Sequence, residues 1–415
     1  MKKAKKIFSF LDLFAGAGGL SEGFIRAGYE PVAHVEYDTN ACLTLKTRMA
    51  YYYLKDNKQE EVYYAYLKKE ITREDFYVHI PSEIINSVIN EKISEQNLNR
   101  IYTQIDAVLT LKEIKEIDFI IGGPPCQAFS LVGRKRNEAK KKTDERIGLY
   151  KLYIKFLKKY KPKVFVFENV LGIKSFEGGK LFPVIKTELA KAGYKIEDIV
   201  LNASKFGVLQ NRKRVFILGY RDDINMRLGE IHEVKHNYKV FDILNDLPEA
   251  QIFPEDGIVH YIKKASEYLE KFDIRNGLDF TTQHITRKNN DNDKEIYRIA
   301  RKLWHDKKIR LNYTDLPEKL INHHNTKAFL DRFKVVADDL PSAHTLVAHI
   351  SKDGHYYIHP FSKEIRSLTV REAARIQSFP DNYFFEGSRT SAFTQIGNAV
   401  PPLMAMKIAE TLKVK

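Results

Sequence analysis

Cysteine is scarce in this 415-residue chain, and its scarcity excludes several kinds of structure. The two cysteines, Cys42 and Cys126, cannot form a disulfide framework, and without a Cys-x-x-Cys pair they cannot form a thiolate zinc site. No apolar run approaches the roughly 20 residues of a membrane span. Asp12 and several glycines interrupt the apolar stretch after Lys3. The apolar core of a signal peptide is continuous, so this stretch is not interpreted as one. We therefore expect a cytoplasmic protein without a metal site or a membrane partner.

Internal repeats and low-complexity segments are also missing. Hydrophobic residues make up 43% of the chain and charged residues 29%, which excludes disorder along the whole chain. The length allows two or three domains. The charge sum is 68 − 54 = +14. This surplus favours a polyanionic partner, although a lysine-rich genome produces the same bias.

Apolar segments alternate with helical stretches through the first half of the chain, which predicts an α/β fold with a parallel sheet. We expect strands at 7–13, 31–36, 118–121, 164–167 and 215–218.

The remaining segments suggest the domain boundaries. The segment 46–105, rich in Tyr, Lys and Glu, is interpreted as a helical insertion. The alternation stops near residue 220, and a capping box at Thr369 predicts a new helix that Pro380 ends. The expected organisation is a large domain (1–220), a small domain (221–365) and a C-terminal return to the large domain (366–415).

The first motif is a glycine-rich turn that starts at Asp12 and ends at Gly19. Such a turn lets a ligand approach the backbone closely. Glu36, 18 residues after Gly18, ends the next expected strand, where an acid can bind ribose hydroxyls. On its own the motif suits a nicotinamide or an adenosyl cofactor, or a tight turn without a ligand.

Two further motifs follow buried strands. Cys126 lies in a proline-stiffened loop beside basic residues, which favour a thiolate nucleophile, although a lone cysteine is more often inert and buried. Glu168 ends the strand at 164–167, where partial burial would raise its pKa and suit a proton donor. A strand-end glutamate is otherwise often a helix cap or a surface acid.

The last two motifs lie farther along the chain. Gln210, Arg212 and Arg214 alternate in an extended segment, so they are expected to share a face, although a basic run is often simply solvated. The segment 395–402, Gln-Ile-Gly-Asn-Ala-Val-Pro-Pro, predicts a turn followed by a helix.

Together and in this order, the five motifs resemble those of the DNA cytosine-5 methyltransferase family. The resemblance runs from Asp12 to Pro402 and includes the helix after Arg366. It implies an α/β, Rossmann-like S-adenosylmethionine-dependent large domain with a smaller target-recognition domain. The implied activity is site-specific methylation at C5 of a cytosine flipped out of duplex DNA, through a covalent Cys126 adduct. It also implies a nucleoid-associated, restriction–modification role beside a separate cognate endonuclease, and we expect a monomer.

The resemblance assigns roles residue by residue. The implied catalytic residues are Cys126, Glu168, Arg212 and Arg214. The implied S-adenosyl-L-methionine contacts are Phe14, Ala15, Gly16, Gly18, Gly19, Leu20, Glu36, Asp106, Pro125, Leu149, Asn398 and Val400, with the match at Asp106 the loosest. The implied DNA contacts are Gln127, Ser130, Arg134 and Gln210, and the segment 134–146, with seven basic and three acidic residues, is expected to meet phosphates.

Three other functions compete with this one. A tRNA cytosine methyltransferase shares the architecture, but the long small domain favours duplex DNA, because reading a duplex site needs a recognition surface. A catalytically dead DNA-binding module is disfavoured by the intact Cys126, Glu168 and Arg214. A nicotinamide oxidoreductase explains only the first motif.

Overall fold

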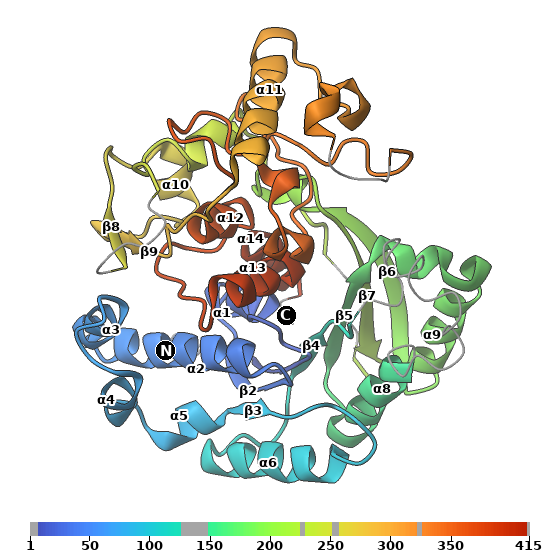
Figure 1. The fold of residues 1–415 in the computed structure, drawn as a ribbon. Helices are drawn as coiled ribbons and strands as arrows, with labels where there is room; N and C mark the ends of the chain where they lie inside the picture. Colours follow the sequence, from blue (N-terminus) through green and yellow to red (C-terminus); the bar gives the residue numbers. More distant parts are fainter. Residues whose placement is uncertain (1–6, 126–147, 225–228, 251–256, 322–325, 413–415) are drawn as a thin grey trace.

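A seven-stranded mixed sheet forms the centre of the computed structural model, which describes residues 7–125, 148–224, 229–250, 257–321 and 326–412 (Figure 1). The strand order is β3-β2-β1-β4-β5-β7-β6. The first five of these are parallel, whereas β7 runs antiparallel to both β5 and β6. The strands are β1 (Ser9–Leu13), β2 (Glu30–Glu36), β3 (Val88–Asn90), β4 (Phe119–Gly122), β5 (Val164–Val170), β6 (Tyr194–Asn202) and β7 (Lys213–Arg221).

The five expected strands are confirmed as β1, β2, β4, β5 and β7, and the α/β fold with them. The expectation of a parallel sheet is wrong for the strand at 215–218, because β7 runs antiparallel to β5 and makes the sheet mixed. Two edge strands were not expected. β3 lies inside the segment interpreted as helical, and three residues are too few to show a period. β6 is mostly half-exposed and carries charged residues, so it lacks the apolar run of a buried strand.

Helices cover both faces of the sheet (Figure 1). Alternate strand residues point to opposite faces, so that Phe10 packs with the helices of the C-terminal segment and Leu11 packs with α6 and α8. Among the described residues outside the segment 229–365, the α-helices are α1 (Gly19–Arg26), α2 (Thr39–Asp56), α3 (Glu60–Leu67), α4 (Arg73–Val78), α5 (Ser82–Asn86), α6 (Leu98–Leu111), α8 (Leu149–Tyr160), α9 (Leu181–Ala190), α12 (Val370–Ile376), α13 (Arg389–Asn398) and α14 (Pro402–Thr411).

The C-terminal segment returns to the first helix of the chain. α14 packs along α1 so closely that a Cβ built on Gly23 would lie 2.5 Å from the Met406 backbone nitrogen. The expected capping box is confirmed at the start of α12, where Thr369 and Glu372 each bond to the other's backbone N–H. This segment therefore brings residues near 400 beside the glycine turn after β1.

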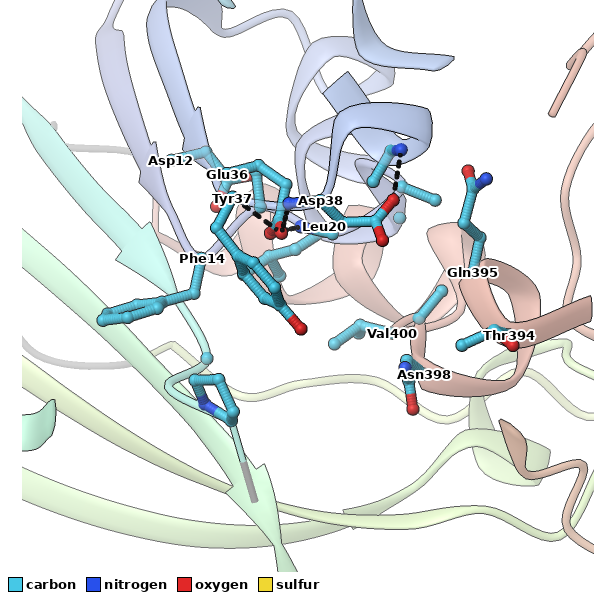
Figure 2. Close-up of a pocket in the computed structure, with 18 of the residues that line it drawn as sticks. Asp12, Phe14, Leu20, Glu36, Tyr37, Asp38, Thr394, Gln395, Asn398 and Val400 are labelled. Atoms are coloured by element: carbon cyan, nitrogen blue, oxygen red, sulfur yellow. Dashed lines mark hydrogen bonds between the residues drawn. The ribbon is translucent and has the colours of Figure 1, made fainter. Parts of the chain in front are cut away.

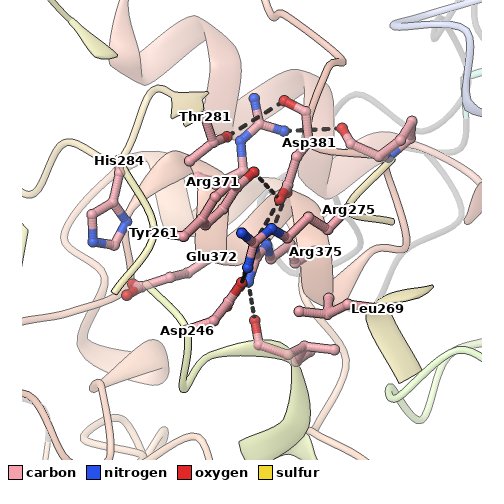
Figure 3. Close-up of polar contacts among 12 residues, drawn as sticks. Asp246, Tyr261, Leu269, Arg275, Thr281, His284, Arg371, Glu372, Arg375 and Asp381 are labelled. Atoms are coloured by element: carbon pink, nitrogen blue, oxygen red, sulfur yellow. Dashed lines mark hydrogen bonds and ion pairs between the residues drawn. The ribbon is translucent and has the colours of Figure 1, made fainter. Parts of the chain in front are cut away.

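The described residues of the segment 229–365 form little regular structure: β8 (Ile258–His260) pairs with β9 (Phe280–Thr282), and the α-helices are α10 (Glu267–Lys271) and α11 (Asp291–Lys307). A buried charge network joins it to α12 (Figure 3). Arg375 contacts Asp246 at 2.5 Å and Asp381 at 2.6 Å, and Tyr261 donates to Asp381 at 2.6 Å. Since all three charged side chains are buried, each depends on the others for compensation.

Among the described residues, no helix is long and apolar enough to cross a membrane.

Candidate active site

A cavity of about 490 Å³ lies at the carboxyl ends of β1, β2 and β5, between them and α13 (Figure 2). Open α/β sheets bind ligands at this edge, because side chains from several strand ends converge there. Of the predicted site residues, the cavity is lined by Phe14, Ala15, Gly16, Gly19, Leu20, Glu36, Pro125, Glu168, Arg214, Asn398 and Val400.

The turn after β1 forms the floor of the cavity. Phe14 adopts a positive φ of 56°, and its half-buried ring stands at one side of the cavity (Figure 2). Gly18 adopts a φ of 75° at the start of α1, a conformation that suits glycine. Gly19 lies against the C-terminal segment, since a Cβ there would lie 2.2 Å from the Val400 carbonyl oxygen. The turn and the residue Val400 therefore form one continuous wall.

Glu36 ends β2 with its carboxylate held by backbone donors. One oxygen accepts from the N–H groups of Tyr37 and Asp38, both at 2.9 Å, and the other accepts from Gly16 at 2.8 Å. Burial raises the pKa of Glu36, and these three hydrogen bonds act in the opposite direction. The carboxylate is thus fixed in one orientation beside the cavity, as a ribose contact requires.

Asp12 is a further candidate for a functional residue. The sequence indicates only that it is the first residue of the glycine-rich turn and predicts no contact for it. It is 1% exposed and lines the cavity, and neither of its carboxylate oxygens has a hydrogen-bond partner in the described part of the chain. Burial, and secondarily the charge of Glu36, raises the pKa of Asp12 well above its usual range. A buried acid without partners is costly unless a ligand supplies a donor.

Glu168 and Arg214 form the polar pair at the far end of the cavity. Glu168 follows the apolar part of β5, Arg214 lies at the start of β7, and Arg214 Nε lies 2.8 Å from Glu168 Oε1. Burial raises the pKa of Glu168, although Arg214 and Arg212 oppose the shift. Next along β5, Asn169 donates to the Pro124 carbonyl at 3.2 Å and so ties this strand end to the loop before Cys126.

Arg212 and Gln210 do not share the surface of Arg214. Both are 0% exposed. Arg212 donates to the carbonyls of Leu346 and Gly397, and Gln210 donates to Ile376 and accepts from the Leu346 N–H. They join three distant segments of the chain. Gln210, predicted as a DNA contact, is buried away from solvent because these backbone groups surround it.

The structure does not bring Asp106 or Leu149 to the cavity. Asp106 lies on α6, where it accepts from Lys159 at 2.9 Å and from Tyr160 at 3.0 Å, and it lines a separate surface hollow. Leu149 begins α8 and packs against the core below the sheet. The residue that ends β3 beside Glu36 is Asn90, whose amide donates to the carbonyls of Glu36 and Tyr37. Asp106 lies within α6 rather than at a strand end, and it is not among the residues that line the cavity.

Several lining residues were not predicted from the sequence. Tyr37 and Asp38 follow Glu36, and their position after a strand-end acid could have marked them. A row of hydroxyl groups faces the cavity from the start of α13, and nothing in its local sequence distinguishes it: Ser388, Thr390, Ser391 and Thr394. Figure 2 shows α13 residues on the side of the cavity opposite Glu36.

Four predicted site residues lie outside the described residues, so the structure does not place them. They are Cys126, Gln127, Ser130 and Arg134.

A family model described as C-5 cytosine-specific DNA methylase matches residues 8–78 and 82–414. The type II methyltransferase M.Bpa9945I of Bacillus paralicheniformis is 40% identical over 97% of this chain and 98% of its own length. M.AgeI of Thalassovita gelatinovora, also a type II methyltransferase, is 28% identical over 97% of this chain and 99% of its own.

Solved structures show the same fold at lower identity. A prophage-encoded E. coli protein described as a DNA modification methyltransferase superposes with a TM-score of 0.64 at 22% identity, covering 98% of each chain. The S. pombe Dnmt2 methyltransferase superposes with a TM-score of 0.54 at 14% identity, also covering 98% of each chain.

Proposed function

The chain belongs to the C-5 cytosine-specific DNA methylase family, and we propose that it uses this cavity to methylate C5 of a cytosine flipped out of duplex DNA. It is a DNA (cytosine-5-)-methyltransferase of the type II kind, given its full-length similarity to M.Bpa9945I. The observation that carries the site assignment is the Glu168–Arg214 pair, which lines the same cavity as Glu36.

S-adenosylmethionine fits the donors and acceptors of the cavity. Glu36 presents a fixed carboxylate for ribose hydroxyls, and the Phe14 ring offers a face for adenine. The unpartnered oxygens of Asp12 suit the cationic end of such a ligand, and Asn398 and Val400 also line the cavity. When bound there, S-adenosylmethionine supplies an activated methyl group.

The protein residues prepare the cytosine ring for that methyl group. The thiolate of Cys126 forms a bond to C6, while Glu168 in its protonated form donates to N3. Electron density then moves to C5, which becomes nucleophilic. Arg214 holds Glu168 in place and contacts the cytosine carbonyl. After methylation a water molecule accepts the C5 proton, the C5–C6 double bond forms again as the Cys126 thiolate leaves, and the N3 proton returns to Glu168.

A tRNA cytosine methyltransferase remains the second candidate. The likeness to Dnmt2 concerns the fold, at 14% identity, whereas the relatives matched at 28% and 40% identity along the chain are type II methyltransferases. DNA is therefore the better-supported substrate, and a restriction–modification partner is the better-supported context.

Trapping the covalent intermediate tests the mechanism. Duplex DNA with 5-fluorocytosine at the target cannot lose its C5 substituent as a proton, so the adduct should persist on a denaturing gel. We expect it with the wild type and absent with Cys126→Ser. The matched control is Cys42→Ser, because Cys42 is buried with its thiol against the Glu36 carbonyl, and burial raises its pKa to about 12. An adduct that survives Cys126→Ser would refute the mechanism.

Bisulfite sequencing of DNA from cells that express the protein tests the substrate. We expect methylated cytosines at one recurring sequence. Methylation of tRNA with unmodified DNA would favour the second candidate instead.

Salt dependence tests the expected phosphate contacts of the segment 134–146. We expect duplex affinity to fall steeply with salt, and the triple variant Lys140→Gln, Lys141→Gln, Lys142→Gln to flatten the slope. An unchanged slope would remove the segment from the DNA contact.

A further inference from the structure

Three helices of the large domain direct donors at one buried carboxylate. Glu386 lies in the loop between α12 and α13 and is 3% exposed. It accepts from Thr47 Oγ1 of α2 at 2.6 Å, from the Tyr66 hydroxyl of α3 at 2.7 Å and from Arg73 Nη2 of α4 at 2.8 Å. The cost of burying this charge is thereby offset by three hydrogen bonds, one of them also an ion pair.

The backbone of Glu386 in turn holds a residue of the cavity wall. Gln395 donates to the Glu386 carbonyl at 2.9 Å, and Glu386 donates its N–H to Thr44 Oγ1 at 2.8 Å. Thr44 completes the link by donating to Gln395 Oε1 at 2.7 Å. Both ends of the Gln395 amide are therefore fixed, and Gln395 lines the cavity (Figure 2).

The loop after Glu386 has no room to shift. Gly387 adopts a φ of 91°, and a Cβ built there would lie 2.6 Å from the side chain of Asn40, which also lines the cavity. The next residue, Ser388, caps α13 by accepting from the Ser391 N–H at 3.2 Å. Movement of Glu386 would consequently carry the hydroxyl row of α13 with it.

We propose that Glu386 is a positioning residue for S-adenosylmethionine, and that α3 and α4 serve cofactor binding by anchoring its carboxylate. The helical insertion then has a function in the reaction although none of its α3 or α4 residues lines the cavity. This inference rests on the proposed use of the cavity for S-adenosylmethionine.

The sharpest perturbation is Tyr66→Phe. It removes one donor to Glu386 but keeps the ring, which stacks on Phe76 with centroids 4.6 Å apart. We expect a several-fold rise in the Kd for S-adenosylhomocysteine by calorimetry, and about a tenfold rise for Glu386→Gln. The KM for S-adenosylmethionine should rise in parallel, while kcat at saturating cofactor and the Kd for duplex DNA stay near wild type.

Two controls separate positioning from a general loss of stability. Tyr238→Phe removes a tyrosine–carboxylate bond of similar length at the surface, to Glu267 at 2.6 Å, and should leave the KM unchanged. Arg73→Ala should raise the KM and Arg73→Lys should restore it, since lysine keeps the charge near Glu386. The matched arginine control is Arg221→Ala, which breaks an ion pair with Asp223 at the opposite end of β7 from Arg214 and should leave the KM unchanged.

The outcomes distinguish the two proposals. If the wild type does not bind S-adenosylhomocysteine, the proposed function fails and this inference with it. If the wild type binds and the Tyr66 and Glu386 variants bind equally well, the inference alone is overturned. A fall in kcat and urea stability with unchanged KM would also overturn it, because Glu386 would then act only on folding.

Discussion

Replacing Gly23 with alanine tests how closely α1 packs against α14. In an exposed helix interior this change stabilises by about 1 kcal/mol, because alanine loses less backbone entropy on folding. Gly23 instead faces α14, where a new Cβ would lie 2.4 Å from the Ala405 Cβ, 2.5 Å from the Met406 nitrogen and 2.6 Å from the Pro402 oxygen. Two of these neighbours are backbone atoms, so a rotamer change cannot relieve the contact.

Overpacking of this kind costs about 1–3 kcal/mol. Because backbone would have to move, we take the upper half of that range and expect Gly23→Ala to lower the free energy of unfolding by about 1–2 kcal/mol after the propensity gain. Urea unfolding should show a lower midpoint with an unchanged m-value. Displacement of α14 should also weaken S-adenosylhomocysteine binding, since Val400, which lines the cavity, lies two residues before that helix.

The contact geometry also predicts the behaviour of a double variant. Ala405→Gly removes the nearest atom but leaves the two backbone contacts in place. Gly23→Ala should therefore still destabilise the protein in the Ala405→Gly background. A Gly23→Ala protein as stable as the wild type, or more stable, would refute the close packing of α1 on α14.

Three other measurements follow from the same structure. Glu168→Gln should lower kcat about 100-fold or more without changing the Kd for S-adenosylhomocysteine. Burial raises the pKa of Glu168, and the protonated form is the active one, so wild-type activity should fall as pH rises through that pKa. The variant's pH profile should lack this fall. Glu36→Ala should abolish most S-adenosylhomocysteine affinity in calorimetry, and equal binding would remove Glu36 from the site. Arg375→Ala removes the buried cation shared by two buried aspartates, which leaves the Asp246 carboxylate only its contact with Arg275 and the Asp381 carboxylate only its bond from Tyr261 among the side-chain hydrogen bonds of the described residues, and it should cost about 3 kcal/mol in urea unfolding. Arg298→Ala, which breaks an exposed pair, should cost under about 1 kcal/mol, and equal losses would contradict the network.

Much of the candidate site could be predicted because its chemistry lies at strand ends. The carboxyl ends of neighbouring parallel strands meet at one edge of a sheet, so the order of strands along the chain already groups Asp12, Glu36 and Glu168. The helix after Thr369 was equally predictable, because a capping box involves only residues three apart.

Prediction failed where the position of a residue depends on distant segments. Gln210, Arg212 and Arg214 have the spacing of one strand face, but β7 begins only at Lys213. The first two belong to an irregular segment whose partners, Leu346 and Ile376, lie more than a hundred residues away. Alternation predicts a common face only inside a regular strand, so their burial could not be deduced locally.

The sequence by itself determined five strands of the sheet, the acids at their ends and the family to which the motifs belong. The tertiary structure alone decided that Asp106 faces away from the cavity, that hydroxyls of α13 line it, and that Glu386 connects the helical insertion to its wall. The physical reason is range: hydrogen-bond spacing and hydrophobic period act over a few residues, whereas a buried carboxylate takes its donors from whichever helices packing brings to it.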